Sequence, residues 1–228
     1  MPENRQMIID SLPEDKLAES NYAMRTVPLP QAAEGEVLCR TLAVSIAAGT
    51  RAGLQGSASY AGAPRTGIVM NGTAVARVAK SMDDRFAEGD LVVCSAGWQD
   101  YSVHAADQVS AIDSADDPAH HLSVLGTNGL TAYFGLLDVG APQPGETVAV
   151  SAAAGSVGHL VGQIARIKGC SVVGIAGTDE KCQRLVNQLG FDTAANYRSE
   201  DFRQDFKAAC PKGIDVYFDN TGGDILGG

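Results

Sequence analysis

A run of small residues between an apolar stretch and an amphipathic stretch has the composition of a phosphate-binding turn. Residues 147–169 read TVAVSAAAGSVGHLVGQIARIKG, and within them residues 153–158 match the G-x-G-x-x-G pattern with alanine in the first place. Such glycines let the backbone approach a pyrophosphate and let the helix pack closely on the strand. An ordinary tight turn also favours small residues. The position inside a strand–helix–strand unit favours a dinucleotide site formed by Gly155, Ser156, Val157 and Gly158.

The end of the next apolar stretch determines which dinucleotide such a turn would hold. NAD enzymes usually place an acid there to bind the ribose hydroxyls, and NADP enzymes avoid that charge. Here the run VVGIA leads into Gly177 and Thr178, and the first acid, Asp179, falls in the opening turn of the next helix, where acids favour the helix dipole. Lys181 is within reach of a 2′-phosphate, although an isolated helix lysine is more commonly a solvated charge. The residues favour NADP and leave the surface-lysine alternative open.

Histidine and cysteine are not spaced as metal ligands. The five cysteines are dispersed and odd in number, which is typical of reduced thiols in cytosolic proteins. The histidines form no ligand pattern; they are His104, His120, His121 and His159. The residues therefore predict a protein without a metal.

Composition narrows the class of partner. The chain has 228 residues, 45 % of them hydrophobic, and a formal net charge of −10. An acidic chain does not collect phosphates of nucleic acid or of anionic lipid, so we expect small-molecule partners, no nucleic acid and no membrane. No apolar run approaches the roughly 18 residues of a membrane span, and the charged N-terminus is unlike a signal peptide. The expected location is the cytoplasm.

Two halves of the chain differ in pattern, with the boundary near residue 123. The first half shows short apolar segments separated by glycine and proline, typical of a compact β domain. Its expected strands are residues 36–44, 68–79, 90–94 and 101–104. The second half alternates strand and helix, which predicts a doubly wound parallel sheet. Its expected helices are residues 122–139, 156–168, 179–189 and 200–210, and its expected strands are residues 147–151, 171–176, 193–197 and 215–219.

The predicted fold is thus α/β, with a mostly-β domain at residues 1–123 followed by a dinucleotide-binding domain at residues 124–228. A complete sheet of this kind has six strands, and only four precede the terminal sequence DNTGGDILGG. We therefore expect the second domain to be C-terminally truncated. If the 228 residues are the whole product, weak or absent catalysis and an association-prone sheet edge are expected.

Longer stretches resemble the leukotriene B4 dehydrogenase or prostaglandin reductase group of the medium-chain dehydrogenase/reductase superfamily. The resemblance rests on GLTAYFGLLDVG (129–140), PGETVAVSAAAGSVG (144–158), GQIARIKGCSVVGIAGTDEK (162–181) and DVYFDNTGG (215–223), with VMNGTAVARVAKS (69–81) and GWQDYSV (97–103) in the first half. It implies a GroES-like substrate domain followed by a Rossmann domain that binds NADPH. It also implies independence of zinc, because residues 69–72 read Val-Met-Asn-Gly where zinc relatives carry Gly-His-Glu.

The resemblance assigns functional roles to residues that the sequence pattern alone does not mark as functional. It implies that Lys181 and Tyr197, the latter in the family's "NY" position, hold the 2′-phosphate, and that Asn220 in the DN-x-GG motif lies at the cofactor. Without it, Tyr197 reads as a core aromatic at a strand end and Asn220 as a turn residue.

The reaction implied by the resemblance is NADPH-dependent reduction of the carbon–carbon double bond of an α,β-unsaturated ketone or aldehyde, in a cytoplasmic enzyme that is a homodimer at full length. The family's enolate-stabilising tyrosine falls beyond Gly228, so no catalytic residue is assigned. The chain departs from the family at residues 44–51, where family members often read VDPYMR, and the substrate is therefore open. Tyr60 is a candidate substrate contact, with a loop tyrosine as the alternative. Two other functions stay open: an NADPH quinone reductase and a catalytically silent NADPH-binding fragment.

Overall fold

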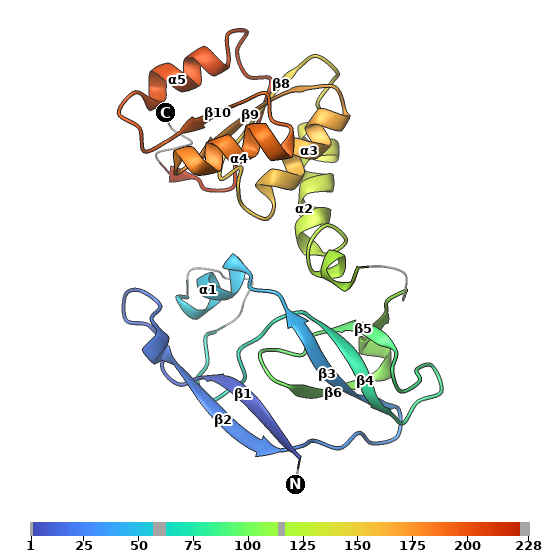
Figure 1. Ribbon diagram of the computed structural model, residues 1–228. Helices are drawn as coiled ribbons and strands as arrows, with labels where there is room; N and C mark the ends of the chain where they lie inside the picture. Colours follow the sequence, from blue (N-terminus) through green and yellow to red (C-terminus); the bar gives the residue numbers. More distant parts are fainter. Residues whose placement is uncertain (1, 57–62, 114–116, 224–228) are drawn as a thin grey trace. The chain divides into compact units, whose positions relative to one another are not determined.

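The chain folds into two compact units, Met1–Leu122 and Ser123–Gly228. In the computed structural model, residues 2–56, 63–113 and 117–223 are described (Figure 1). Tyr60, the candidate substrate contact, lies outside the described residues. No helix of the described part is long and apolar enough to cross a membrane.

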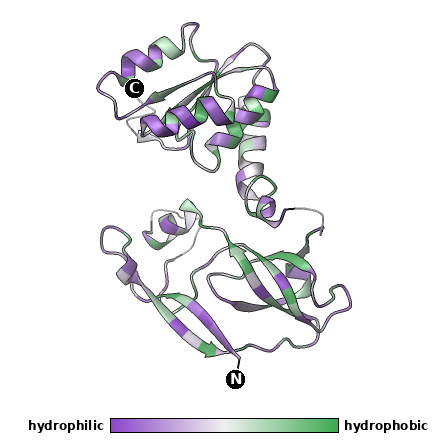
Figure 2. Cartoon of the chain, viewed as in Figure 1, coloured by the Kyte–Doolittle hydropathy of each residue, from purple (hydrophilic) through white to green (hydrophobic). Residues whose placement is uncertain are grey.

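The first unit consists of two antiparallel sheets. A five-stranded sheet has the order β6-β3-β4-β5-β7, and β1 and β2 form a separate pair. The strands are β1 (Glu3–Ile9), β2 (Tyr22–Pro28), β3 (Glu36–Val44), β4 (Ala74–Ser81), β5 (Leu91–Cys94), β6 (Tyr101–Ala105) and β7 (Ser110–Ala111), and α1 (Ala48–Leu54) is the one α-helix described here. Strands β3 and β4 are mostly hydrophobic, broken by single hydrophilic residues (Figure 2). Their inward side chains form the core of this unit, as the alternating pattern predicts.

Three features of this unit differ from the sequence-based expectation. The hairpin of β1 and β2 was not predicted, because both strands mix polar and apolar residues and no tight-turn signal joins them. Helix α1 was also not predicted, because two of its seven residues are glycines. The strand expected from residue 68 begins only at Ala74, since Ile68 and Val69 instead bond to the end of β1.

A buried asparagine joins this hairpin to β6. Asn4 is 1 % exposed, and its amide donates to the carbonyl of Tyr101 at 2.9 Å and accepts from the N–H of Tyr101 at 2.9 Å. In a third bond, Asn4 Nδ2 donates to Gln99 Oε1 at 3.1 Å. The buried amide therefore satisfies the backbone donor and the backbone acceptor of Tyr101.

Replacing Asn4 with Leu is expected to destabilise the protein by about 2–4 kcal/mol, because both backbone groups of Tyr101 lose their partners in a buried place. Urea unfolding followed by the fluorescence of Trp98, the single tryptophan of the chain, measures this loss. Thr26→Leu on the exposed side of β2 is the matched control and should change stability by less than about 0.5 kcal/mol. Equal stability of the two variants would contradict the role given to Asn4.

The second unit is a parallel sheet with the strand order β10-β9-β8-β11. Its strands are β8 (Thr147–Val150), β9 (Ser171–Ala176), β10 (Thr193–Asn196) and β11 (Val216–Phe218). The helices are α2 (Thr127–Phe134), α3 (Gly158–Ile167), α4 (Asp179–Leu189) and α5 (Phe202–Ala209). The predicted fold class, a mostly-β domain followed by a Rossmann-type parallel sheet, is confirmed.

The helix expected at residues 122–139 begins five residues later than expected. Residues Pro118–Leu122 form a 3₁₀ turn, α2 begins at Thr127, and a π-helical segment continues it over Gly135–Gly140. The chain before α2 folds back on the helix, so that a Cβ on Gly129 would lie 1.7 Å from the carbonyl oxygen of Val124. Apolar periodicity cannot reveal such a close approach of backbone to backbone.

The strand order creates a switch point between β8 and β11. Strands β8, β9 and β10 follow one another toward one edge of the sheet, and β11 lies on the other side of β8. In open parallel sheets the ligand binds at the carboxyl ends of the two strands where the order reverses. The ends of β8 and β11 are therefore the place to look for a site.

Candidate functional site

The turn between β8 and α3 is packed too tightly for larger side chains. A Cβ on Gly158 would lie 2.5 Å from the carbonyl oxygen of Ala152 and 2.8 Å from the Cα of Ala153. A Cβ on Gly155 would lie 3.0 Å from that same oxygen. Ala152 itself has φ +44°, a left-handed conformation that costs an L-residue about 1–2 kcal/mol. The third glycine of the pattern therefore serves close packing, as its position in the sequence predicts.

This turn has backbone N–H groups that are available to a ligand. The carbonyl of Gly155 accepts from the N–H of His159 at 3.1 Å and lies 2.7 Å from its ring Nδ1. Among the described residues, the N–H groups of Ser156, Val157 and Gly158 donate to no other group of the chain. They open helix α3, where the helix dipole adds positive potential. The turn can therefore hold an anion such as a pyrophosphate.

A cavity of about 260 Å³ lies beside this turn, at the carboxyl end of β9. Its lining includes both Gly155 and Lys181, and it contains two cationic side chains and no acidic one among the described residues. The lining residues are Ala152, Ala154, Gly155, Ala176, Gly177, Thr178, Lys181, Tyr197, Arg198 and Thr221. An anionic group carrying about two charges would match this lining.

Tyr197 covers the end of β9. A Cβ on Gly177 would lie 2.9 Å from Tyr197 Cε1 and 3.0 Å from its hydroxyl oxygen. The ring therefore occupies the space that a side chain at position 177 would need, including the acid that NAD enzymes usually carry at the end of this strand. Tyr197 is 37 % exposed, so the reading as a core aromatic does not describe it.

Helix α4 starts with a side-chain cap that orients its first turn. Thr178 Oγ1 accepts from the backbone N–H of Lys181 at 3.2 Å. This bond fixes the backbone of Lys181 at the edge of the cavity, and the Lys181 side chain is exposed. Its ammonium group is free to reach a ligand in the cavity.

Asp179, the first acid after β9, is held by a neighbour and does not line the cavity. Asn196 Nδ2 donates to Asp179 Oδ1 at 2.7 Å. The two residues instead line an adjoining open depression between α4, β10 and α5. The acid that could have bound a ribose diol therefore has another partner.

Asn220 belongs to a network at the switch point. The hydroxyl of the fully buried Ser151 donates to Asp219 Oδ1 at 2.7 Å and accepts from the N–H of Asn220 at 2.7 Å. Asn220 Nδ2 donates to the carbonyl of Ser151 at 2.9 Å. These bonds join the end of β8 to the end of β11. Asn220 contributes both its backbone N–H and its side-chain Nδ2 to this connection.

The carboxylate of Asp219 organises the loop that follows. It accepts from the N–H of Thr221 at 3.1 Å and from the N–H of Gly222 at 2.8 Å. Burial acts to raise the pKa of Asp219, but the hydrogen bonds from Ser151, Thr221 and Gly222 outweigh it and hold the pKa below its ordinary value of 3.8. The group is therefore ionised at neutral pH and keeps Thr221 at the cavity wall.

The structure brings together three of the residues singled out from the sequence: Gly155, Lys181 and Tyr197 line one cavity. Ser156, Val157 and Gly158 continue the same turn, and Asn220 adjoins it through Ser151. Sequence reasoning missed Arg198, Thr221 and Ser151. Arg198 could have been noticed as a cation directly after the "NY" pair, but nothing local marks Ser151, whose partners follow 68 and 69 residues later.

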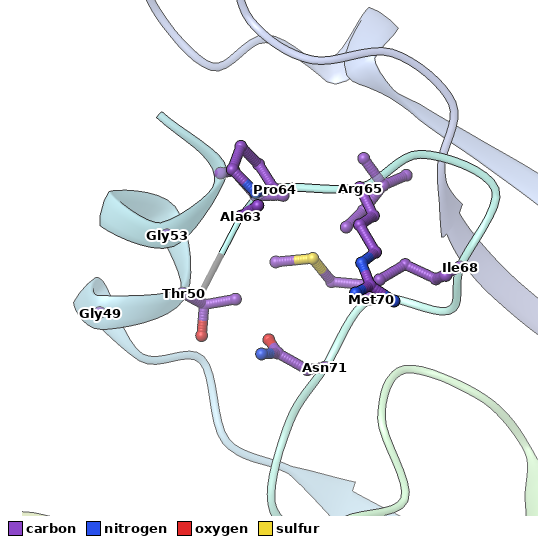
Figure 3. Close-up of a pocket in the computed structure, with 11 residues that line it drawn as sticks. Gly49, Thr50, Gly53, Ala63, Pro64, Arg65, Ile68, Met70 and Asn71 are labelled. Atoms are coloured by element: carbon purple, nitrogen blue, oxygen red, sulfur yellow. The ribbon is translucent and has the colours of Figure 1, made fainter. Parts of the chain in front are cut away.

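A second cavity, of about 350 Å³, lies within the first unit. Figure 3 shows Thr50, Met70 and Asn71 directed into it. Apolar residues dominate its wall, and Arg65 is the cation among the described lining residues. These are Ile9, Gly49, Thr50, Gly53, Leu54, Ala63, Pro64, Arg65, Ile68, Met70 and Asn71. Such a wall suits a largely apolar small molecule.

The side chains that could ligate a metal do not form a ligand set in the described part of the chain. In residues 2–56, 63–113 and 117–223, no three His, Cys, Asp or Glu side chains lie together as a metal site requires. All five cysteines are free thiols. The absence of zinc stays a prediction.

Two family models match the chain. The first, described as the N-terminal domain of oxidoreductase, matches residues 5–112, and the second, described as zinc-binding dehydrogenase, matches residues 156–227. The name of the second model mentions zinc, whereas the part of the chain described here groups no set of metal ligands.

Individual relatives agree with these models. The chain is 40 % identical over 224 residues to the NADPH-dependent curcumin reductase of Escherichia coli (strain K12), covering 98 % of this chain and 65 % of that protein. It is 40 % identical over 211 residues to prostaglandin reductase 1 of Bos taurus, covering 90 % of this chain and 62 % of that protein. The chain thus spans just under two thirds of the length of these relatives.

A solved structure extends the match to three dimensions. The crystal structure of CurA in complex with NADPH from Vibrio vulnificus superposes with a TM-score of 0.92 at 37 % identity, covering 98 % of this chain and 66 % of that one. Over the part that the two chains share, this chain therefore has the fold of that protein.

Proposed function

Because the chain belongs to the medium-chain dehydrogenase/reductase superfamily, we propose that it binds NADPH and reduces the carbon–carbon double bond of α,β-unsaturated ketones or aldehydes. The observation that carries the proposal is the cavity at the end of β9, which is lined by Gly155, Lys181 and Tyr197 and by no described acid. The names of its relatives, curcumin reductase and prostaglandin reductase, support the class of reaction.

The residues of this cavity fit NADPH. Ser156, Val157 and Gly158 would donate their N–H groups to the pyrophosphate, because these donors have no partner in the described chain and lie at a helix N-terminus. Lys181 and the hydroxyl of Tyr197 would bind the 2′-phosphate, since both line the same cavity. Asn220 would adjoin the bound cofactor at the switch point, held by its two bonds to Ser151.

Bound NADPH would supply a hydride for conjugate addition to the substrate. The chain itself would bind the cofactor, in a cavity whose charge and shape complement the nucleotide, and would orient it toward the substrate. The largely apolar cavity of the first unit, with Thr50, Arg65 and Asn71 as its polar groups, is the proposed place for the hydrophobic part of the substrate. We assign no catalytic acid, and Tyr60 stays a prediction.

The cofactor proposal is tested by titrating the purified protein with NADPH and with NADH while following nucleotide fluorescence. NADPH should bind at least about tenfold more tightly, and Lys181→Ala should remove most of that difference because a charge-assisted bond to the 2′-phosphate is lost. Lys168→Ala, an exposed lysine after α3, is the charge-matched control and should leave both affinities unchanged. Equal affinity of the unaltered protein for the two nucleotides would contradict the NADP assignment.

The reaction is tested separately, by NADPH oxidation in the presence of an enone and, in parallel, of a quinone. Faster turnover of the enone supports the proposed reaction, and faster turnover of the quinone supports a quinone reductase. Tight NADPH binding with no oxidation by either acceptor would mean a silent NADPH-binding protein. The three outcomes distinguish the functions that the residues left open.

A cytoplasmic location, independence of zinc and a homodimeric full-length form are part of the same proposal. Support for the first two comes from the five free thiols and from the lack of a grouped ligand set among the described residues. Metal analysis of the purified protein and its mass in solution test the last two.

A further inference from the structure

The "N" of the "NY" pair is not accounted for by the function proposed above. Asn196 ends strand β10 and is half-buried, and its side chain makes two bonds in different directions. Its Nδ2 donates to Asp179 Oδ1 at 2.7 Å, and its Oδ1 accepts from the backbone N–H of Arg198 at 3.0 Å. One amide thus connects the first acid of α4 to a cation that lines the cavity.

Arg198 is placed to reach the same ligand as Lys181. It lines the cavity together with Lys181, and its guanidinium carbon lies 5.6 Å from the centre of the Tyr197 ring. A cation over an aromatic face is held in one region without being neutralised. In the described part of the chain, Arg198 forms no ion pair with a carboxylate. Lys181 and Arg198 therefore place about two positive charges beside the end of β9. A 2′-phosphate carries about two negative charges, so the charges match.

Asp179 would oppose this arrangement if it turned toward the cavity. A carboxylate there would repel a phosphate and would accept hydrogen bonds from an unphosphorylated ribose, which is how NAD enzymes select their cofactor. Its bond to Asn196 holds it in the adjoining depression instead. The amide therefore acts on selectivity without touching the nucleotide.

Resting on the proposed NADPH function, we propose that Arg198 and Asn196 set the preference of this site for a 2′-phosphorylated nucleotide. Arg198 is a second phosphate-binding cation beside Lys181. Asn196 is a positioning residue that keeps the carboxylate of Asp179 out of the cavity and holds the backbone of Arg198 in place.

The experiment compares the dissociation constants of NADPH and NADH across variants of the whole protein. Arg198→Ala should weaken NADPH binding about tenfold and leave NADH binding unchanged, and Arg198→Lys should recover most of the loss. Arg203→Ala removes an equal charge from an exposed position on α5 that does not line the cavity, and should change neither constant.

Asn196 is tested with two substitutions, Asn196→Asp and Asn196→Ala. The first is nearly the same size as asparagine and therefore disturbs the fold least. Asn196→Asp keeps the acceptor for Arg198 and replaces the donor with a like charge against Asp179, so NADPH should bind about tenfold more weakly. Asn196→Ala frees Asp179, so the ratio of NADPH to NADH affinity should narrow. Adding Asp179→Ala to Asn196→Ala should restore that ratio, a result that a merely structural role of Asn196 would not produce.

Each outcome has a distinct meaning. If Lys181→Ala lowers NADPH affinity while the Arg198 and Asn196 variants keep the ratio of the unaltered protein, the present inference is overturned and the proposed function stands. If the unaltered protein prefers neither nucleotide, both are overturned. Thermal melts of every variant show whether a lost affinity reflects a lost fold.

Discussion

Gly158→Val is expected to lower the affinity of the protein for NADPH about 100-fold, which corresponds to about 2.7 kcal/mol. The first atom of the new side chain would lie 2.5 Å from the carbonyl oxygen of Ala152 and 2.8 Å from the Cα of Ala153, and neither backbone atom can yield easily. Helix α3 must therefore move away from the turn. Its N–H groups would leave the pyrophosphate, and bonds to a charged group are worth about 1.5–3 kcal/mol each.

Nucleotide fluorescence titration measures this loss, and circular dichroism verifies that the total helix content of the protein is unchanged. Ile167→Ala is a control on the same helix, because its side chain is 84 % exposed at the far end of α3 and should not affect binding. Unchanged NADPH affinity of a folded Gly158→Val variant would show that the turn does not hold the pyrophosphate.

Phe191→Ala is expected to destabilise the second unit by about 3–5 kcal/mol, the usual cost of removing a buried aromatic ring. Phe191 is 3 % exposed and lies within the main core cluster of this unit. Two glycines make room for it: a Cβ on Gly162 would lie 2.0 Å from Phe191 Cζ, and one on Gly174 would lie 3.0 Å from Phe191 Cδ1. The ring therefore packs directly on the backbone of α3 and β9.

A double-mutant cycle tests this packing more sharply than either variant alone. Gly162→Ala should destabilise the protein by about 1–3 kcal/mol while the ring is present, because it overpacks the core. In the Phe191→Ala background the same change should be neutral or stabilising, because the methyl group enters the vacated space and alanine favours a helix.

Urea unfolding followed by circular dichroism at helix wavelengths reports on this unit, which contains α2, α3, α4 and α5. Phe206→Ala on α5 is the matched control, since that ring is only half-buried and lies outside the core cluster; its cost should be clearly smaller. Simple addition of the two single effects would mean that Phe191 and Gly162 do not share the contact described.

The order of the second unit was predictable because local signals agree. Apolar runs of four to six residues alternate with amphipathic stretches, and glycine or proline stands between them, so β8, α3, β9 and α4 appear within about two residues of their expected bounds. The first unit was less predictable, since β1 and β2 carry no clear alternation and no tight-turn signal joins them into their hairpin.

The candidate site shows the same division. Gly155, Gly158 and Lys181 could be chosen from the sequence, because a strand–turn–helix unit places its functional groups within a few residues. Tyr197 and Asn220 needed the family resemblance, because a single aromatic or amide at a strand end has many ordinary explanations. Neither the sequence pattern nor the family resemblance assigned a role to Asn196 or Arg198.

The α/β class, the glycine turn and the absence of an acid at the end of β9 can therefore be read from the order of residues, since each depends on neighbours in the chain. Three contacts are visible only in the folded chain: Tyr197 fills the space above Gly177, Asn196 binds an acid 17 residues before it, and Asn4 bonds to Tyr101 at a separation of 97 residues. The reason is physical: such contacts arise where strands far apart in the chain end at one edge of a sheet, and no local pattern of residues records that meeting.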